Sequence, residues 1–366
     1  METFHQDSTT LMNTQLFVGR ISGLLNPLTY AIINAAVILL VWTGGRQVDA
    51  GILSQGQVVA LVNYMSQILV ELIKLANLII NVTKSLACLS RINKILDQET
   101  GMTEGTVEEQ KQEKGVPCVE FKNVSIIYEE GADAALSHVS FRAYPGETIG
   151  VIGGTGSGKS TLVNLIPRFY DVSEGEVLVD GRNVQDYTYE GLRGKVGVVP
   201  QKAVLFSGTI RENLQWGKKD ATDEELYAAL ETAQGREIVE KKEKGLDTEV
   251  LQSGRNLSGG QRQRLTIARA LVRDPEILIL DDSASALDFA TDAKLRKALR
   301  EHKKEATVFL VSQRAATIRQ ADRIIVLDDG AVAGIGKHEE LYQNCEVYRE
   351  ICNSQVSAEE EKAHEA

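Results

Sequence analysis

The chain has 366 residues, of which 43% are apolar and 25% charged, and its formal net charge is −11. These proportions indicate a folded protein of two or three domains and exclude a mostly disordered chain, a collagen-like repeat and a disulfide scaffold. The acidic excess argues against a nucleic-acid-binding protein, so we expect no nucleic acid among the partners. The 4 cysteines form no CxxC pair and have no metal-ligand spacing, which indicates reduced thiols in or facing a cytosol.

Two long apolar segments lie in the first hundred residues. Residues 21–45 carry no charge, and a helix of this length is about 37 Å long, enough to cross a hydrocarbon core of about 30 Å. A second uncharged segment, residues 50–70, continues as an apolar pattern with helical spacing to Ile95. We therefore expect two transmembrane helices in a lipid bilayer, over about 21–45 and 52–96. The less favoured alternative is a buried hydrophobic hairpin in a soluble protein.

Both ends of this predicted hairpin are expected in the cytoplasm. Lys84, Arg91 and Lys94 follow the second apolar segment, whereas the short connection between the segments holds one arginine and one aspartate. Because loops rich in Lys and Arg tend to stay in the cytoplasm, we predict a multi-pass protein of the cell membrane with a cytoplasmic domain after it. The glycines predicted to form the turn between the helices are Gly44, Gly45 and Gly51.

The rest of the chain divides by composition. Residues 97–115 are rich in Glu, Lys, Gln, Gly and Thr, which predicts a solvated linker after a partial transmembrane domain over 1–96. Over 116–355, short apolar strands alternate with amphipathic helices, as in an α/β domain. Residues 356–366 are rich in Glu and Ala and are expected to form a flexible tail.

A complete phosphate-binding pattern lies near the start of the α/β domain. A β-rich run, residues 148–152, is followed by GGTGSGKS, which matches GxxxxGK[ST], and then by a predicted helix over 161–169. In this context backbone N–H groups converge on phosphate oxygens, Lys159 reaches the β- and γ-phosphates and the Ser160 hydroxyl binds Mg²⁺. Kinases, GTPases and many ATPases share this loop. The candidate nucleotide-binding residues are Gly153, Gly154, Thr155, Gly156, Ser157, Gly158, Lys159, Ser160 and Thr161.

Two further patterns point to phosphate chemistry. The buried-strand run 277–280 ends in Asp281 and Asp282, and Asp281 is placed there to hold Mg²⁺ through water. The second pattern, LSGGQ, precedes a helical segment and forms another anion-binding helix terminus. One nucleotide does not need two such termini from one chain, whereas two chains arranged head to tail would use both. The residues of the second terminus that would contact nucleotide are Ser258, Gly259, Gly260 and Gln261.

With these motifs the sequence resembles, over essentially its whole length, the ATP-binding cassette (ABC) transporter family. The resemblance is to an exporter subunit whose nucleotide-binding domain follows its membrane part. It implies an α/β P-loop NTPase fold, with a β-subdomain and a helical signature subdomain, after an all-α transmembrane segment. It also implies ATP and Mg²⁺ as cofactors, and ATP hydrolysis coupled to transport.

The resemblance assigns roles to individual positions. The glycine-rich loop and Ile277–Asp281 are similar to the Walker A and Walker B motifs, and LSGGQ is similar to the signature sequence. Gln201 resembles the Q-loop glutamine that contacts Mg²⁺. Tyr128, near the end of an expected strand beginning at Val119, resembles the aromatic residue that stacks on adenine. Residues 285–288 resemble the D-loop, and residues 248–250 resemble the loop that meets the membrane domain.

Two positions depart from the family pattern. Asp282 stands where the family has a catalytic glutamate, and its carboxylate falls about 1 Å short of the water it should polarise. Gln313 stands in place of the switch histidine and is neutral at every pH. Either change alone is compatible with drift, but together they predict a site that binds ATP and hydrolyses it slowly. Because the signature sequence is complete, we expect a heterodimer with a second ABC subunit that has the consensus Glu and His.

The length of the membrane part is a further departure. Exporter subunits of the family have six transmembrane helices before the cassette, and two are expected here, which suggests an internal start at Met1, a gene fragment or one piece of a split subunit. The transported substrate stays open. The alternatives are a regulatory nucleotide-binding module, a soluble cassette ATPase of the DNA-repair or translation kind, and a non-functional fragment.

Overall fold

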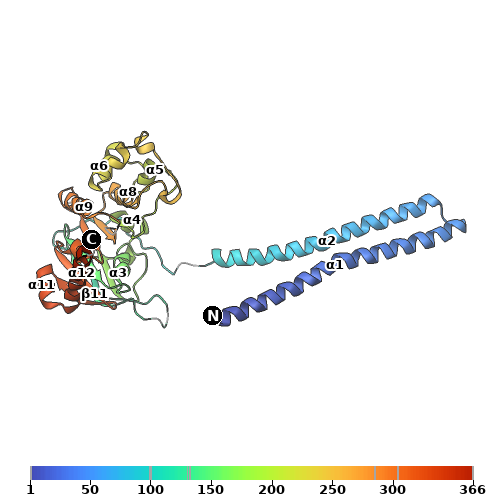
Figure 1. The fold of residues 1–366 in the computed structure, drawn as a ribbon, viewed down its shortest axis with the longest axis horizontal. Helices are drawn as coiled ribbons and strands as arrows, with labels where there is room; N and C mark the ends of the chain where they lie inside the picture. The colour runs from blue at the N-terminus through green and yellow to red at the C-terminus, as the bar shows by residue number, and fades with distance from the viewer. Residues whose placement is uncertain are drawn as a thin grey trace. The chain divides into compact units, whose positions relative to one another are not determined.

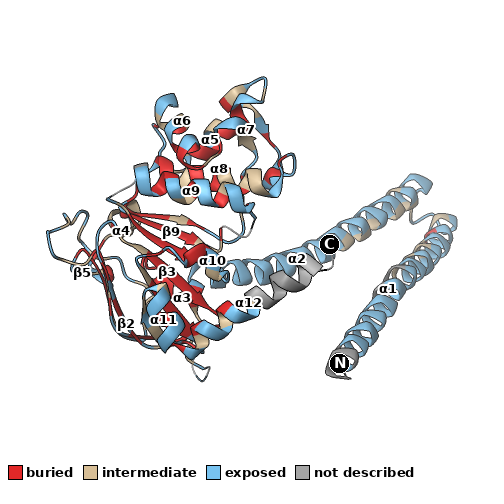
Figure 2. Ribbon diagram, turned by 60° about the vertical axis from the view of Figure 1, so that its left-hand side comes forward, coloured by how far each residue is buried: buried red, intermediate tan, exposed pale blue. Residues whose placement is uncertain are grey.

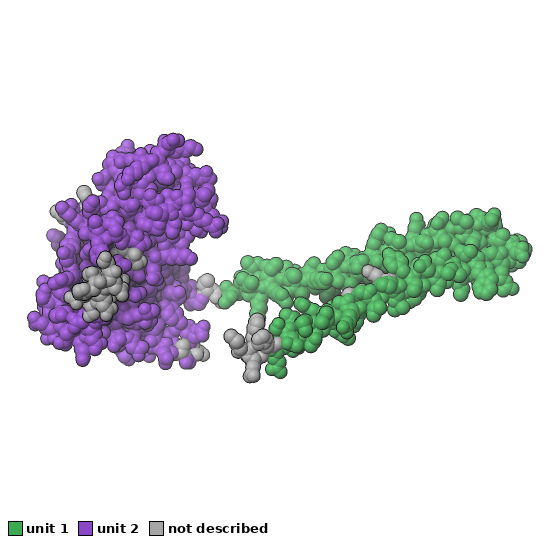
Figure 3. All heavy atoms as spheres, in the orientation of Figure 1, with its two compact units in different colours: residues 1–100 green, residues 101–366 purple. Residues whose placement is uncertain are grey.

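The computed structural model describes residues 2–98, 101–129, 131, 133–283, 286–302 and 305–364. The chain forms two compact units, residues 1–100 and residues 101–366, each described here by itself (Figures 1 and 3).

The first unit is a pair of long helices. They are α1 (Glu2–Asp49) and α2 (Gln55–Leu96), which run side by side (Figure 1). The parts long and apolar enough to cross a membrane are Pro27–Asp49 and Gln55–Leu96, and their side chains are largely exposed (Figure 2). Two apolar helices are thus confirmed; α1 begins at Glu2, well before residue 21, and the predicted bounds of the membrane span stay a prediction. The apolar pattern marks only the membrane-compatible part, since a helix pairs its own backbone groups in polar and apolar surroundings alike.

The turn between the helices is shorter than the glycine pattern predicted. Gly44 and Gly45 lie inside α1, and only Gly51, with φ of +70°, lies in the turn. Ser54 begins α2 with a capping box, since its backbone N–H donates to Gln57 Oε1 at 2.8 Å. A Cβ on Gly44 would lie 2.8 Å from Val58 Cγ1, so the small residue instead allows the two helices to approach closely.

The second unit is built on a six-stranded sheet in the order β12-β11-β3-β10-β9-β6, parallel except for β12. Its strands alternate side chains between two buried cores on opposite faces: Ile277 and Ile279 belong to one core, and Leu278 and Leu280 to the other. Figure 2 shows these strands as the most buried part of the unit. The strands are β3 (Thr148–Gly153), β6 (Val196–Val199), β9 (Ile277–Asp281), β10 (Thr307–Val311), β11 (Arg323–Asp328) and β12 (Ala331–Gly336).

An antiparallel sheet covers one side of this core, in the order β2-β1-β4-β5, and forms the expected β-subdomain. The strands are β1 (Val119–Ile126), β2 (Leu136–Ala143), β4 (Glu174–Val179) and β5 (Arg182–Asn183). Strand β1 ends at Ile126, so the prediction that it continues to Tyr128 is wrong. Its pairing to both neighbours shifts register within residues 121–126, and the ladder does not continue beyond them.

Helices α5 to α8 form the expected helical subdomain, with the short strands β7 (Gly208–Thr209) and β8 (Glu249–Val250) (Figure 1). The helices of the unit are α3 (Lys159–Leu165), α4 (Tyr189–Lys195), α5 (Ile210–Gln215), α6 (Asp223–Thr232), α7 (Arg236–Glu240), α8 (Gly259–Val272), α9 (Phe289–His302), α10 (Ala315–Ile318), α11 (His338–Asn344) and α12 (Glu346–His364). Helix α12 passes the predicted boundary at residue 356, because Glu, Ala and Lys are strong helix formers. The flexibility of this tail stays a prediction.

The predicted linker is not wholly solvated. Gly105 and Val107 donate backbone hydrogen bonds to the carbonyls of Tyr187 (3.1 Å) and Asp186 (2.9 Å). The Tyr189 N–H donates to Glu104 Oε1 at 2.9 Å. Residues 104–107 therefore form a strap that is fixed on the segment before β6. The polar composition predicted that this segment would be surrounded by water. Instead, its backbone and the Glu104 side chain form hydrogen bonds with the backbone of residues 186–189.

Gly105→Ala should destabilise the protein by about 1–3 kcal/mol, because a Cβ on Gly105 would collide with the carbonyl carbon and oxygen of Asp186. Gly101→Ala is the matched control, since a Cβ there meets nothing within 4 Å. Thermal unfolding of both variants, together with the rate of proteolytic cleavage of the strap, checks this prediction. Equal behaviour of the two variants would contradict the docking of the strap.

Candidate functional site

A pocket of about 290 Å³ lies at the carboxyl ends of β3, β9 and β10. Parallel strands place their carboxyl ends at one edge of a sheet, so residues distant in sequence meet here. The lining residues are Ala135, Thr155, Gly156, Gly158, Lys159, Ser160, Thr161, Gln201, Asp281, Asp282, Val311 and Gln313. The structure thus brings together the glycine-rich loop and four of the side chains that sequence reasoning placed beside it: Gln201, Asp281, Asp282 and Gln313. The sequence did not predict Ala135 and Val311 as lining residues, because their small apolar side chains match no phosphate- or metal-binding pattern.

The glycine-rich loop depends on backbone conformations that other residues adopt poorly. Gly156 and Gly158 have φ of +83° and +91°. A Cβ on Gly153 would collide with the Leu327 carbonyl oxygen, and one on Gly158 would lie 2.6 Å from the Ala135 oxygen. Helix α3 follows directly, beginning at Lys159 rather than at 161 and without a side-chain cap. Its first N–H groups therefore point toward the space that the loop encloses.

Lys159 lies inside this loop. Its Nζ donates to the carbonyl oxygens of Gly153 at 3.0 Å and Gly154 at 2.5 Å, and the residue is 9% exposed. Burial lowers the pKa of the Lys159 ammonium, while the carboxylates of Asp282 and Asp281 act in the opposite direction. The ammonium is thus a partly desolvated positive charge held at the position where the loop can present it to phosphate.

Oxygen-bearing side chains face each other across the pocket. Ser160 Oγ donates to Asp281 Oδ1 at 3.2 Å, and Gln201 Nε2 donates to Asp282 Oδ2 at 3.4 Å. Hydroxyl, amide and carboxylate oxygens suit Mg²⁺, which takes one or two protein carboxylates and completes its shell with phosphate and water. Within the described residues no cluster of three or more His, Cys, Asp or Glu could hold a metal by itself. The donor set therefore fits Mg²⁺ bound together with a phosphorylated ligand.

Burial raises the pKa of both carboxyl groups. For Asp281 the charge of Asp282 adds to the effect of burial, and the bond from Ser160 opposes it. For Asp282 the charges of Arg314 and Lys159 oppose it. Arg314 directly follows Gln313 and was missed in the sequence, although a cation beside an expected site residue was a usable signal. Burial of two neighbouring carboxylates lowers the stability of the folded protein, and a bound divalent cation would offset this effect.

Asp282→Asn should raise the melting temperature by about 2–4 °C at pH 7, in the absence of Mg²⁺ and nucleotide. A carboxyl group whose pKa is raised by folding holds its proton more tightly in the folded state, so folding stability falls as the pH rises through that pKa. The gain should therefore shrink as the pH falls toward the ordinary value of 3.8. Thermal unfolding across this pH range is the measurement. Asp329→Asn is the matched control, since Asp329 is exposed and shares a φ of +44° with Asp282. An equal rise in melting temperature in both variants would show that burial of the Asp282 carboxylate is not the cause.

Two more site residues have defined surroundings. The Gln313 carbonyl accepts from Gln355 Nε2 at 2.7 Å, which fixes the backbone while the residue lines the pocket. Tyr128 lies beside α3, where its hydroxyl donates to Thr161 Oγ1 at 3.1 Å. The residue is 49% exposed, and its ring packs edge-to-face with that of Tyr170, with 5.0 Å between ring centres. Tyr128 is thus near the loop but outside the lining of the pocket. Stacking on adenine stays a prediction, and sequence reasoning missed Tyr170.

The signature residues lie elsewhere. Ser258 caps α8: its Oγ accepts from the Gln261 N–H at 3.2 Å, and its own N–H donates to Gln261 Oε1 at 3.0 Å. Residues 257–261 are absent from the lining of the pocket. A Cβ on Gly260 would lie 3.3 Å from the Ala286 oxygen, so the expected D-loop is adjacent, although its Ser285 lies outside the described residues. The two helix termini that the sequence predicts to bind phosphate therefore lie apart in this chain, and phosphate binding at Ser258 stays a prediction. The segment 248–250 includes β8, which pairs with β7.

The fold and the phosphate-binding loop together define a P-loop NTPase domain. Residues 136–285 match the family model described as ABC transporter, so this part of the chain is an ABC transporter cassette. The chain is also similar to proteins and structures of this kind along nearly all of its length.

The chain is 40% identical over 360 residues to the uncharacterized ABC transporter ATP-binding protein YfiB of Bacillus subtilis (strain 168), covering 98% of this chain and 62% of that protein. It is 35% identical over 358 residues to the ATP-dependent lipid A-core flippase of Haemophilus influenzae (strain 86-028NP), covering 97% and 60%. A solved structure of a bacterial Atm1-family ABC exporter with ATP bound matches with a TM-score of 0.76 and 30% identity, over 96% of this chain and 60% of that one.

The chain thus spans about three fifths of the length of these relatives. It carries an ABC transporter cassette behind two apolar helices and is homologous to ABC exporters that combine membrane and nucleotide-binding parts. The predicted fold class and the resemblance to ABC exporters are confirmed.

Proposed function

We propose that this chain is an ATP-binding subunit of an ABC exporter in the cell membrane, with its cassette in the cytoplasm. It binds ATP with Mg²⁺ at a dimer interface and couples binding and hydrolysis to transport across the bilayer. The observation that carries this proposal is the single pocket in which Lys159, Ser160, Asp281 and Gln201 meet around the glycine-rich loop. Two apolar helices precede this cassette, as in membrane exporters.

The residues of the pocket have distinct tasks in binding. Backbone N–H groups of the loop and of α3 would hold the phosphate oxygens, and Lys159 would exchange its bonds to loop carbonyls for bonds to phosphate. Ser160, Asp281 and Gln201 would hold Mg²⁺, which when bound neutralises phosphate charge. The exposed ring of Tyr128 would cover the adenine base. No nucleic acid is needed for any of these contacts.

The hydrolytic part of the site is weaker. Asp282 is one methylene shorter than glutamate, and a displacement of a general base by about 1 Å can cost about 100-fold in rate. Gln313 lines the same pocket and has no group that titrates. We infer a site that retains ATP and hydrolyses it slowly.

The separate, complete signature terminus supports a heterodimer. In a head-to-tail pair, the Walker residues and the signature residues of one chain serve different nucleotides. A homodimer would carry Asp282 and Gln313 at both sites, whereas a partner with the consensus Glu and His would provide one competent site that Ser258 to Gln261 complete. The identity of the partner and the transported substrate are open to experiment.

The test compares ATPase activity of purified membranes that contain this chain alone, a candidate partner alone, and both. We expect slow hydrolysis by this chain alone and fast hydrolysis by the pair. Ser258→Ala in this chain should slow the pair, since that residue would serve the competent site. If this chain alone hydrolyses as fast as the pair, and Lys159→Ala abolishes that activity, the degenerate site is refuted.

A regulatory nucleotide-binding module is the second candidate, and the combined departures at Asp282 and Gln313 favour it. In that case ATP at this site stabilises the dimer without being consumed. Transport by reconstituted pairs separates the two: a module predicts unchanged transport when hydrolysis at this site is removed but binding is kept. The exporter subunit predicts slower transport.

A further inference from the structure

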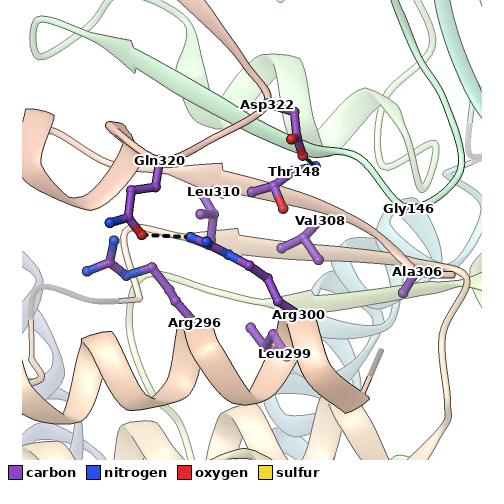
Figure 4. A pocket seen from close by; sticks show the side chains of 10 residues that line it. All are labelled: Gly146, Thr148, Arg296, Leu299, Arg300, Ala306, Val308, Leu310, Gln320 and Asp322. Carbon is purple, nitrogen blue, oxygen red and sulfur yellow. Dashed lines mark hydrogen bonds between the residues drawn. The ribbon is translucent and has the colours of Figure 1, made fainter. Parts of the chain in front are cut away.

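A second pocket lies at the edge of the central sheet opposite the glycine-rich loop. It has a volume of about 210 Å³ and lies between α9 and the amino ends of β3 and β10 (Figure 4). Its other wall comes from the segment between α10 and β11. The proposed ATP site uses none of these residues, so the pocket has no assigned task.

One side of the pocket is positively charged. Arg296 Nη2 forms an ion pair with Asp292 Oδ2 at 2.9 Å, and its Nη1 donates to the Thr317 carbonyl at 3.0 Å, so this guanidinium is fixed and compensated. Arg300, one helical turn further, donates from Nη2 to the neutral Gln320 Oε1 at 3.0 Å. Within the described part of the chain, Arg300 has no carboxylate at ion-pairing distance. Its charge is therefore available to a ligand.

The other side carries a negative charge. Asp322 Oδ2 accepts from the Thr148 N–H at 2.8 Å, which fixes this carboxylate at the start of β3 (Figure 4). Among the residues that the structure describes, no Lys or Arg forms an ion pair with Asp322. Counting only described residues, the pocket thus has one cation and one anion without an ion-pair partner, from different elements.

Between these charges the floor is apolar. Leu299, Val308 and Leu310 are 3%, 6% and 7% exposed, and they belong to the core on this face of the sheet. An apolar floor with a few polar groups at its rim is typical of small-molecule sites, and this pocket is small even among those. The ligand it suits is therefore compact, with a short apolar body.

We propose that this pocket binds an apolar α-amino acid. The ligand carboxylate lies on the Arg300 guanidinium, its ammonium on the Asp322 carboxylate, and its side chain on Leu299, Val308 and Leu310. A simple anion would be repelled by Asp322, and a simple amine would be repelled by the Arg300 guanidinium. A zwitterion satisfies both free charges at once, and such charge-assisted bonds are the strong ones.

The test is isothermal titration of the full chain with leucine. Leucine should bind at one site. Two analogues, 4-methylpentanoate without the ammonium and 3-methylbutylamine without the carboxylate, should each bind at least about 10-fold more weakly. Arg300→Gln and Asp322→Asn should each weaken leucine by a similar factor. The asparagine keeps an acceptor for the Thr148 N–H, so the fold of this edge is retained.

Lys294→Gln is the matched control, since it removes one positive charge from the exposed face of α9 outside the pocket. Leucine binding by this control should equal that of the unmodified chain. Three results would each overturn the proposal: no binding of leucine, unchanged binding in both pocket variants, or 4-methylpentanoate binding as tightly as leucine. The last would indicate a plain anion site.

Discussion

Lys159→Ala should lower the affinity of the chain for ATP about 100-fold, since a bond between an ammonium and phosphate is worth about 1.5–3 kcal/mol and would be lost without replacement. The fold should survive this change. Burial lowers the pKa of Lys159, so the charged side chain costs stability in the empty site. That relief offsets part of the loss of its bonds to the Gly153 and Gly154 carbonyls.

Titration with a fluorescent ATP analogue measures this effect, and thermal unfolding without nucleotide verifies the fold. Lys219→Ala is the matched control, since this lysine is exposed in the same unit and outside the pocket. Unchanged affinity in a folded Lys159→Ala variant would exclude the glycine-rich loop as the nucleotide site. It would leave the proposed amino-acid pocket untouched.

The second large effect is a gain of function. Asp282→Glu combined with Gln313→His should raise ATP hydrolysis at this site about 100-fold in the assembled dimer, with the partner's own site inactivated. The added methylene carries the carboxylate toward the water, and the imidazole restores a group that can bridge water and phosphate. Hydrolysis rates at saturating ATP are the measurement.

The backbone sets a cost for this gain. Asp282 has φ of +44°, in the left-handed region that Asp tolerates better than most residues. The glutamate should therefore lower stability by about 1 kcal/mol while it speeds hydrolysis. Asp282→Asn is the control and should give no gain in rate. A double variant that binds ATP and hydrolyses no faster would show that the two departures are not what limits this site.

Local patterns were enough to predict the site. The strand, glycine loop and helix around Lys159 are contiguous, and parallel strands must end at a common edge, so Asp281 was expected beside the loop, whereas Gln201 and Gln313 were expected there only from the resemblance to ABC exporters. The two apolar helices were predicted from the length of the two uncharged, apolar segments.

What the sequence did not predict depends on contacts between distant segments. The strap at Gly105 pairs with backbone that no composition reveals, and the polar start of α1 has no apolar periodicity. Arg300 and Asp322 line one pocket only because α9 packs on the sheet, since each residue alone looks like ordinary surface. Tyr128 lies beyond its strand because the ladder of β1 is irregular before it.

The cap at Ser258 has a consequence for the proposed dimer. A serine hydroxyl has one proton and two lone pairs, and the bond from the Gln261 N–H occupies a lone pair only. Within the described chain the proton has no acceptor, so it can be donated to an outside oxygen while the helix end stays intact. An oxygen of a bound partner or ligand could therefore accept this proton without breaking the bond that caps α8.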